Sequence, residues 1–327
     1  MTSAIVMAGY NNRWAVRRYA KIVAEHYGEK FIESGYKPLR EFTTRIDGKT
    51  ISKPLVEFTI DKLLDSSSIE DIVLVGHQML LEQRLGRYLR RSNKPFTIVN
   101  QNARLSSEII QNFRIKPRKV KYNSIAGNMI KGYTASAAFR NQAHALFVAS
   151  DSPLTSLNFI NYFRDLTKPL IGNYDIICPA VAMADQTDKL GRFPLRLVND
   201  SGYDVQGHID QYGRMGFRLS SVIIANPNHF DINTANTAYN LRKCLNPKVQ
   251  IKLFKITRSH GYPNVYSKYF LRRDLSISEV EKFATDYFNG RVKIIPINGE
   301  ETTYDYDGTE HEFLFLNRIL NNLDSRQ

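Results

Sequence analysis

The sequence contains little cysteine, with Cys178 and Cys244 the only two among 327 residues. Two cysteines exclude a disulfide scaffold and a four-cysteine zinc site. Long apolar runs are also missing, because none approaches the roughly 20 residues that a membrane-spanning helix requires. The first residues enter an apolar run with no basic segment before it, which predicts that there is no signal peptide. We therefore expect a cytoplasmic protein without a membrane span.

Acidic residues are outnumbered by basic ones. Asp and Glu total 32 and Lys and Arg total 45, so the formal net charge is +13. This excess predicts an anionic partner but does not identify it. Charged residues make up 24% and hydrophobic residues 43% of the chain, so a core can form and disorder of the whole chain is excluded.

Short apolar runs alternate with helical patterns along the first half of the chain. The runs at 5–8, 72–76 and 145–149 are typical of buried strands. Strands that alternate with helices indicate an α/β architecture of three layers, with a mostly parallel central sheet between helices. We expect a single domain over 1–327 with a helical insertion around 231–290. Helical spacing of apolar residues predicts helices over 14–27, 57–64, 79–89, 129–141 and 276–288.

A polar segment, Gly9-Tyr10-Asn11-Asn12-Arg13, follows the first predicted strand. Ligands of parallel α/β sheets gather at such strand ends. Gly and Asn tolerate positive φ, so the backbone N–H groups could face a phosphate, and Arg13 would add a charge-assisted contact. The segment lacks the further glycines of a dinucleotide fingerprint and the Gly-Lys-Ser/Thr of a P-loop. The alternative is an ordinary strand-to-helix turn with a surface arginine.

Carboxylates follow two later strands. Asp151 comes directly after a buried strand, where it is well placed to ligate a hard cation such as Mg²⁺. Its alternative role is the N-cap of the helix that starts near Ser156. Asp305 and Asp307 follow the last predicted strand and face the same way if this segment is extended. Together with Asp151 they could hold one or two Mg²⁺ ions and neutralise a triphosphate, the alternative being a solvated acidic turn.

In this order the segments resemble the MobA-like NTP transferases of the nucleotidyltransferase superfamily, which share a Rossmann-like GT-A fold with nucleotide-diphospho-sugar transferases. That family opens with a strand and an Ala-Ala-Gly-x-Gly-x-Arg loop, followed by Lys-Pro-Leu. Residues 8–13 and 37–39 occupy these places. Residues 128–132 resemble the helix-opening segment near the nucleotide. Residues 150–154 resemble the metal-binding Asp-x-Pro-Leu, and residues 305–309 the terminal Asp-x-Asp-Thr element.

The chain departs from this family pattern in three places. Asn11 stands where the family has its second loop glycine, and Asn can adopt the left-handed conformation. The stretch from Arg13 to Lys37 is long for the family. An extra residue before Thr309 makes Asp305 and Asp307 alternatives for one ligand role, of which we prefer Asp307. These departures leave room for a member that binds a nucleotide without turning it over.

The resemblance implies a nucleotidyltransferase of the EC 2.7.7 type. Such an enzyme moves a nucleoside monophosphate from an NTP to a phosphorylated acceptor (a sugar phosphate, a polyol phosphate or a cofactor precursor) and releases pyrophosphate. Mg²⁺ or Mn²⁺ would be held by Asp151 and Asp307, with Asp305 as the alternative, and Arg13 and Lys37 would be the catalytic cations at the phosphates. The implied nucleotide-binding residues are Ala8, Gly9, Asn11, Asn12 and Asn128.

The anionic small-molecule acceptor is expected on the later half of the chain. Lys189, Arg192 and Arg196 alternate there with apolar residues and could face an acceptor phosphate, or they could belong to a charged edge strand. A nucleotide-sugar-dependent glycosyltransferase of the same fold is the first alternative. A non-catalytic nucleotide- or nucleic-acid-binding protein is the second. It would use the basic clusters 87–94 and 114–121, but no nucleic-acid module accompanies them. The base, the acceptor and the oligomeric state stay open.

Overall fold

The computed structural model describes most of the chain. The helix expected over 14–27 lies outside the described residues. The structure describes residues 2–9, 36–46, 49–116, 120, 123–187, 189–190, 194–241, 247–306 and 310–323.

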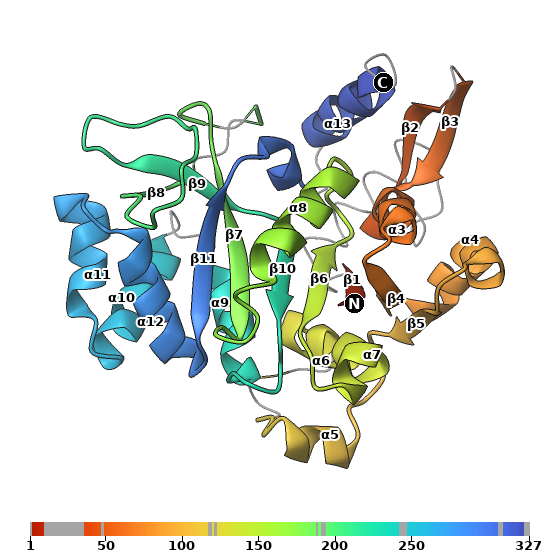
Figure 1. Cartoon of the computed structure of the whole chain (residues 1–327), viewed down its shortest axis with the longest axis horizontal. Coiled ribbons are helices and arrows are strands. Elements are labelled where there is room, and N and C mark those ends of the chain that lie inside the picture. Colours follow the sequence, from red (N-terminus) through yellow and green to blue (C-terminus); the bar gives the residue numbers. More distant parts are fainter. Residues whose placement is uncertain are drawn as a thin grey trace.

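A mixed sheet forms the centre of the molecule (Figure 1). Its strands are β1 (Thr2–Ala8), β4 (Ile69–Gly76), β5 (Phe96–Asn100), β6 (Ala145–Ala149), β7 (Ile176–Ala182), β8 (Leu195–Leu197), β9 (Met215–Leu219), β10 (Val222–Ala225) and β11 (Val292–Ile297). The strand order is β5-β4-β1-β6-β10-β7-β9-β8, and β11 also pairs with β7. All of these strands except β9 and β10 run in the same direction. The expected α/β fold with a mostly parallel sheet is confirmed.

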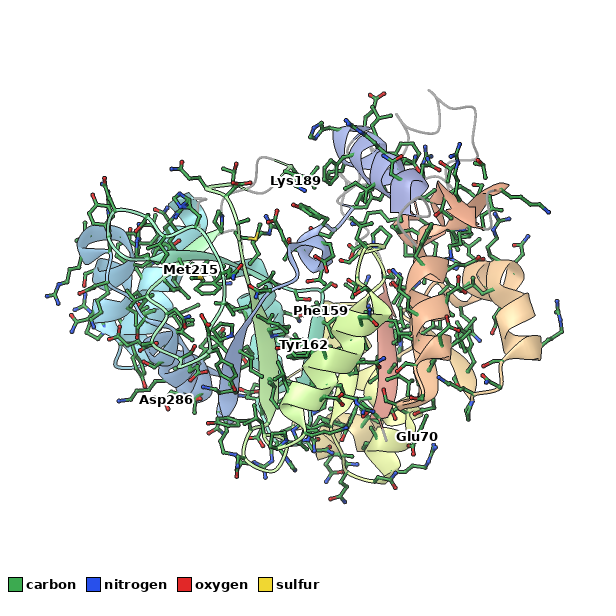
Figure 2. The ribbon with its side chains drawn as sticks, turned by 45° about the horizontal axis from the view of Figure 1, so that its top comes forward. Glu70, Phe159, Tyr162, Lys189, Met215 and Asp286 are labelled. Atoms are coloured by element: carbon green, nitrogen blue, oxygen red, sulfur yellow. The ribbon has the colours of Figure 1, made fainter. Side chains whose placement is uncertain are left out.

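Helices cover both faces of this sheet. Alternate residues of β1 point to opposite faces, so Ala4 and Val6 pack against α3 and α8, whereas Ile5 packs against α6. Figure 2 shows Phe159 and Tyr162 on α8, where the first is buried in the core and the second is exposed. The α-helices are α3 (Leu55–Asp65), α4 (Gln78–Arg91), α5 (Ser107–Asn112), α6 (Ile125–Ala135), α7 (Ala137–Arg140), α8 (Leu157–Thr167), α9 (Ala235–Leu241), α10 (Pro247–Ser259), α11 (Pro263–Ser267), α12 (Ile277–Phe288) and α13 (Glu310–Leu323). The shorter helical turns are η1 (Lys37–Leu39), η2 (Ile232–Thr234), η3 (Lys268–Arg272) and η4 (Glu300–Thr303).

Local sequence explains several helix boundaries. The predicted helix over 276–288 is α12, and it begins with the capping box formed by Ser276 and Glu279. The helix predicted over 129–141 is instead two helices, α6 and α7. The break falls at Ser136, whose extended backbone ends α6 and whose hydroxyl donates to the Tyr133 carbonyl oxygen. A serine that bonds its own backbone competes with helix continuation, and the apolar spacing does not reveal this.

A two-stranded hairpin lies apart from the main sheet. It consists of β2 (Glu41–Ile46) and β3 (Lys49–Pro54), and α13 packs against it. The Thr43 N–H donates to the Asn317 side-chain oxygen (2.9 Å), and the Thr44 hydroxyl donates to the Leu320 carbonyl oxygen (3.0 Å). Phe42, Leu316 and Leu320 are buried in one cluster. The end of the chain is therefore fixed to a segment close to its beginning.

The last part of β7 pairs with β9, and β9 pairs with β8, to form an antiparallel arm. Ala182 is the partner of Phe217, which in turn is the partner of Leu195. The pairing of β7 with β10 involves Ile176 and Ile177, several residues earlier. Because strands rise about 3.3 Å per residue, the arm extends beyond the carboxyl ends of the central strands. It therefore lies on the same side of the molecule as those strand ends.

The segment from 231 to 290 contains η2, α9, α10, α11, η3 and α12 in its described part. Whether it is an insertion in a single domain stays a prediction. Among the described residues, no helix has both the length and the apolar character needed to cross a bilayer.

Candidate active site

Four parallel strands end side by side at the carboxyl edge of the sheet. Ala8 of β1 is the partner of Gly76 of β4, which is the partner of Asn100 of β5, and Met7 of β1 is the partner of Ala149 of β6. The chain leaves β1 towards β4 and β5 and later returns to β6 on its other side. This makes β1 the point at which the strand order reverses, where ligands of open α/β sheets bind.

Gly9 lies against two buried amide side chains at this edge. A Cβ atom at Gly9 would lie 2.5 Å from the Asn128 Nδ2 atom and 3.0 Å from the Gln101 Oε1 atom. Asn128 is 4% and Gln101 is 1% exposed. Asn128 Oδ1 is buried and has no hydrogen-bond partner among the described residues. A buried acceptor of this kind is suited to a donor group of a ligand.

Sequence reasoning missed Gln101, although it lies directly after the strand β5. A polar residue in this place follows the same pattern as Gly9 and Asp151, which come directly or almost directly after β1 and β6. That pattern could have identified it. Its backbone N–H donates to the Gly76 carbonyl oxygen (2.8 Å), and its own carbonyl oxygen accepts from the Lys131 ammonium group. These bonds fix the loop that follows β5 beside β1.

Tyr36 holds the lysine-bearing segment at the same edge. Its hydroxyl donates to the Ala8 carbonyl oxygen (2.6 Å) and accepts from the His77 N–H (2.9 Å). The Tyr36 oxygen lies 2.3 Å from where a Cβ atom at Gly76 would be, so only glycine leaves room for this contact. Because Lys37 follows directly in η1, these bonds place it beside the end of β1.

Lys37 and Asp151 form an ion pair with an Nζ to Oδ2 distance of 3.0 Å. The Asp151 carbonyl oxygen also accepts from the Tyr306 N–H (2.8 Å), so the segment after β6 contacts the segment after η4. The N-cap role considered for Asp151 is wrong, because the Ser156 hydroxyl caps α8 by accepting from the Phe159 N–H. Asp151 thus contacts both Lys37 and Tyr306, which are each more than 100 residues away from it in the sequence.

Asp305 adds a second carboxylate to this group. It lies 4.0 Å from a guanidinium nitrogen of Arg218, which belongs to β9 in the arm. Sequence reasoning missed Arg218, because only the pairing of β9 with β7 brings it here. The main-chain bond from Tyr306 to Asp151 thus brings two segments together, one with the Lys37–Asp151 pair and one with Asp305 beside Arg218.

The donor set suits a hard divalent cation in its chemistry. Carboxylate and hydroxyl oxygens are the ligands that Mg²⁺ prefers. The Ser152 hydroxyl, next to Asp151, is 1% exposed and has no hydrogen-bond partner among the described residues. No group of three His, Cys, Asp or Glu side chains converges in the part of the chain that the structure describes, and Asp307 lies outside that part.

Lys62 supports the turn that carries Asp151. Its ammonium group donates to the Pro153 carbonyl oxygen (2.6 Å). Burial lowers its pKa to about 8, and the neighbouring Lys53 acts in the same direction, while Asp61 opposes them. A lowered lysine pKa means that the folded state binds fewer protons than the unfolded state between pH 8 and the ordinary lysine pKa near 10.5.

Lys62→Met tests this pKa through stability. The penalty for the buried charge is fully present below pH 8 and is relieved as pH rises towards 10.5. We expect the free energy of unfolding of the native chain to rise relative to that of Lys62→Met over this interval. Urea unfolding at pH 7.5 to 10.5 measures it, and Lys168→Met on the surface is the control. Parallel pH profiles for native chain and Lys62→Met would contradict the assignment.

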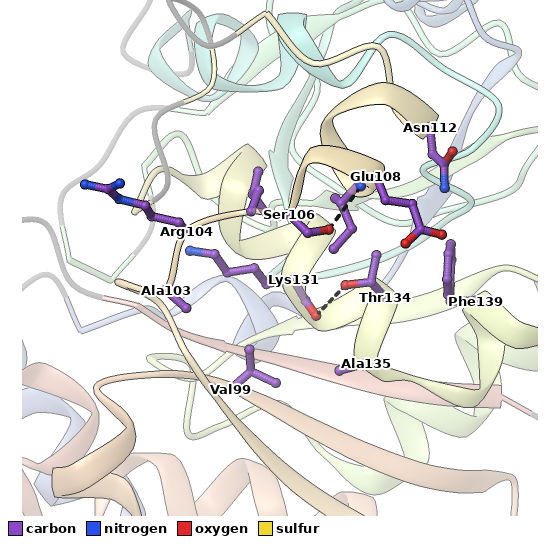
Figure 3. Close-up of a pocket in the computed structure, with 12 residues that line it drawn as sticks. Val99, Ala103, Arg104, Ser106, Glu108, Asn112, Lys131, Thr134, Ala135 and Phe139 are labelled. Carbon is purple, nitrogen blue, oxygen red and sulfur yellow. Dashed lines mark hydrogen bonds between the residues drawn. The ribbon is translucent and has the colours of Figure 1, made fainter.

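A cleft of about 430 Å³ opens beside the loop after β5 (Figure 3). Arg104 and Lys131 extend towards one end of it, and Glu108 and Asn112 lie at the other. Lys131 is 5% exposed, and burial lowers its pKa to about 8. The cleft shares Lys131 with the loop that holds Gln101. Its lining does not include Lys37, Asp151 or Asp305, so the cleft is separate from the site that these residues form.

The remaining predicted residues have mixed outcomes. Ala8 is buried at the end of β1. Lys189 is exposed after β7 (Figure 2). Arg196 belongs to β8, where it donates to the Gln186 carbonyl oxygen (3.2 Å) and lies 4.0 Å from Asp210. The predicted residues Asn11, Asn12, Arg13, Arg192 and Asp307 lie outside the described residues.

The basic cluster at 87–94 includes one lysine with a structural role. The Lys94 ammonium group donates to the carbonyl oxygens of Leu63 (2.9 Å) and Ser66 (2.5 Å) at the end of α3. A cation at this place satisfies carbonyl groups that the helix leaves open. Lys94 therefore stabilises the end of α3.

Comparison with known proteins was made on both sequence and structure. No protein-family model matches the chain, and a search of the curated proteins finds no similar sequence. Among solved structures, the chain is similar to a hypothetical transferase from Thermus thermophilus, with a TM-score of 0.55 and 16% identity over 95% of this chain and 99% of that one. The two proteins share a fold.

Two further structures give weaker matches. One is a 4-diphosphocytidyl-2C-methyl-D-erythritol synthase from Anaerococcus prevotii, with a TM-score of 0.46 and 12% identity over 98% of both chains. The other is a CMP:2-keto-3-deoxy-manno-octonic acid synthetase complexed with CTP, with a TM-score of 0.47 and 8% identity over 98% of both chains. Matches with TM-scores below 0.5 carry no argument, so function has to be argued from the site.

Proposed function

We propose that the chain is a nucleotidyltransferase of the EC 2.7.7 type, nearest to the MobA-like branch. It would transfer a nucleoside monophosphate from an NTP to a phosphorylated small molecule and release pyrophosphate. The observation that carries this proposal is the contact of Lys37 with Asp151 at the carboxyl edge of the sheet. These residues come from the Lys-Pro-Leu and Asp-Ser-Pro-Leu segments, which the resemblance places at the triphosphate.

In this proposal the cations of the site bind the phosphates of the NTP. Lys37 Nζ is only part-buried and can exchange the Asp151 carboxylate for a phosphate oxygen. Arg218, beside Asp305, can hold a second phosphate through a charge-assisted bond. Attack on the α-phosphorus spreads negative charge over oxygen atoms, so fixed cations lower the barrier by electrostatic stabilisation. Arg13 keeps its proposed place at the leaving pyrophosphate.

A divalent cation, Mg²⁺ or Mn²⁺, would be held by Asp151 and by Asp305 or Asp307. When bound, it supplies neutralisation of the triphosphate charge. The Tyr306 N–H fixes the main chain of Asp151 and so keeps the two carboxylate segments together. A phosphate acceptor is already anionic, so the reaction requires no general base.

The nucleoside would bind next to Gly9. The close approach of Asn128 and Gln101 to Gly9 leaves this segment without space for a Cβ atom. The open Asn128 oxygen can accept from an N–H of a base or from a ribose hydroxyl. The acceptor would bind next to the arm. Lys189, Arg192 and Arg196 stay candidates for its binding, together with Arg218.

Thermal unfolding with each of the four NTPs and Mg²⁺ tests this function. A ligand at 100 times its dissociation constant stabilises the folded form by about 2.7 kcal/mol. We expect one NTP to raise the melting temperature by several degrees, and Lys37→Ala to reduce this shift by more than half. Lys168→Ala, which removes an exposed ion pair with Asp165, is the matched control.

Pyrophosphate release distinguishes the competing functions. A nucleotidyltransferase releases pyrophosphate when the preferred NTP is combined with a suitable phosphorylated sugar or polyol. A glycosyltransferase would instead be stabilised by a nucleotide-sugar and release none. Absence of a thermal shift with every NTP would refute the proposal.

A further inference from the structure

The positive charge of the chain is concentrated in the helical segment before α12. Residues 232–273 contain no Asp or Glu. The basic residues of this segment are Arg242, Lys243, Lys248, Lys252, Lys255, Arg258, Lys268, Arg272 and Arg273. Because no acidic residue interrupts this stretch of sequence, the fields of its exposed basic residues on α10 and η3 add to one another.

The exposed residues of α10 and of η3, which both pack against α11, include cations and aliphatic side chains. We define the basic patch as Ile251, Lys252, Lys255, Arg258, Leu271 and Arg272, all of which are exposed. Ile251 is 58% and Leu271 is 75% exposed. The four cations of the patch have no ion pair within the described residues. Figure 1 shows α10 and α11 at one end of the molecule, beyond β11.

The opposite side of these helices packs against the rest of the protein. Thr257 on α10 is fully buried, and Val265 and Tyr269 pack against the core beneath the arm. Between the helices, the ring of Tyr266 contacts those of Phe254 (5.4 Å between centroids) and Phe270 (4.6 Å). The aliphatic residues of the patch are therefore exposed on a fixed support.

The nearest acidic side chains of α12 have other partners. Glu279 pairs with Lys268, Asp286 accepts from the Tyr262 hydroxyl, and Glu281 pairs with Lys293. None of these pairings involves a cation of the patch. Asp274 is exposed and follows Arg272 and Arg273 in the sequence, but no ion pair joins it to the patch among the described residues. The cations of the patch can therefore attract an anionic partner.

We propose that the basic patch docks the protein on a membrane surface that is rich in anionic lipid. Each Lys or Arg near such a surface contributes about 1 kcal/mol of attraction. Ile251 and Leu271 would enter the boundary between headgroups and acyl chains, where burial of apolar area adds affinity. A nucleic acid would use the same cations, but its phosphate backbone offers nothing to two exposed aliphatic side chains. The combination therefore favours a bilayer.

Sedimentation with lipid vesicles tests this proposal. Vesicles of phosphatidylcholine with 30% phosphatidylglycerol are compared with vesicles of pure phosphatidylcholine at 50 and 300 mM salt. We expect binding to the anionic vesicles alone, with weaker binding at high salt. The triple variant Lys252→Gln/Lys255→Gln/Arg258→Gln should lower the partition coefficient about 100-fold, because three contributions of about 1 kcal/mol are lost.

Two controls separate docking from general charge and from folding. Arg45→Gln/Lys49→Gln/Lys116→Gln removes the same charge elsewhere, from residues that are exposed, and should bind like the native chain. Ile251→Ser/Leu271→Ser should weaken vesicle binding at least tenfold. The binding that remains should be more sensitive to salt concentration than that of the native chain. All variants should keep the native melting temperature.

Three results would overturn the proposal. The first is equal binding to both vesicle types, and the second is equal loss in the control triple variant. The third is tight binding of RNA or DNA in gel-shift assays at a salt concentration where anionic vesicles do not bind. None of these outcomes depends on NTP turnover, so docking and catalysis are tested separately.

Discussion

Replacing Asp151 with Asn is expected to abolish metal-dependent pyrophosphate release, with a loss of about 1,000-fold or more in rate. A loss of this size corresponds to about 4 kcal/mol of transition-state stabilisation. The amide keeps the shape of the side chain but removes the charge that pairs with Lys37 and that, in the proposed function, would hold a divalent cation. Measurement of pyrophosphate release with the preferred NTP and acceptor gives the rate directly.

The same substitution should leave the fold almost unchanged. Lys37 and Asp151 are both part-exposed, and ion pairs of this kind contribute about 1 kcal/mol or less to stability. Asp165→Asn is the matched control, because Asp165 is an exposed carboxylate that pairs with Arg164 and Lys168. It should retain full activity. Release that survives in Asp151→Asn would show that the metal assignment is wrong.

Gly132→Ala is expected to destabilise the protein by about 2 kcal/mol, because overpacking of a close-packed core costs about 1–3 kcal/mol. An added Cβ would lie 2.3 Å from the Ile5 Cγ2 atom and 2.9 Å from the Val75 Cγ2 atom. Both neighbours are buried and branched at Cβ, so they have little freedom to move aside. Helix α6 would have to shift away from β1, and Asn128 would shift with it. Nucleotide affinity should therefore fall as well.

Gly86→Ala is the matched control for this prediction. Gly86 lies in α4, where a new Cβ would meet only the flexible Arg90 side chain at 3.3 Å. Alanine is a better helix former than glycine, so this variant should gain about 0.5–1 kcal/mol of stability. Urea unfolding of both variants measures the two changes. Equal effects of the two substitutions would refute the steric explanation.

The central parallel strands of the fold were predictable because each contains a short apolar run. Strands β4 and β6 are buried on both faces, and this makes their sequences stand out. The hairpin of β2 and β3 was missed, since it is only partly buried and has few apolar residues. Strand β9 was missed for a related reason: its five residues include Gly216 and Arg218.

The site was predictable only as far as strand ends reveal it. Asp151 and Asp305 belong to short motifs that follow predicted strands, and Lys37 belongs to a short motif before a predicted element. The structure brings Lys37 into contact with Asp151. Arg218 reaches the site through the pairing of the arm, a long-range contact that no local pattern encodes. The basic patch was not predicted because its cations are spread along two helices. The basic residues at 87–94 and 114–121 are more closely spaced and form clearer clusters in the sequence.

The contact of α13 with the hairpin has a consequence for how the protein is made. The hydrogen-bond partners of Thr43 are Asn317 and Asn321, which are synthesised more than 270 residues later. The partner of the Asp151 carbonyl oxygen, Tyr306, is also synthesised much later than Asp151. A ribosome has therefore finished most of the chain before the hairpin gains its packing partner. Until then Phe42 and the hairpin edge are uncovered, and the carboxylates of the site are still apart. Completion of this contact therefore depends on residues that are synthesised more than 270 positions after Thr43.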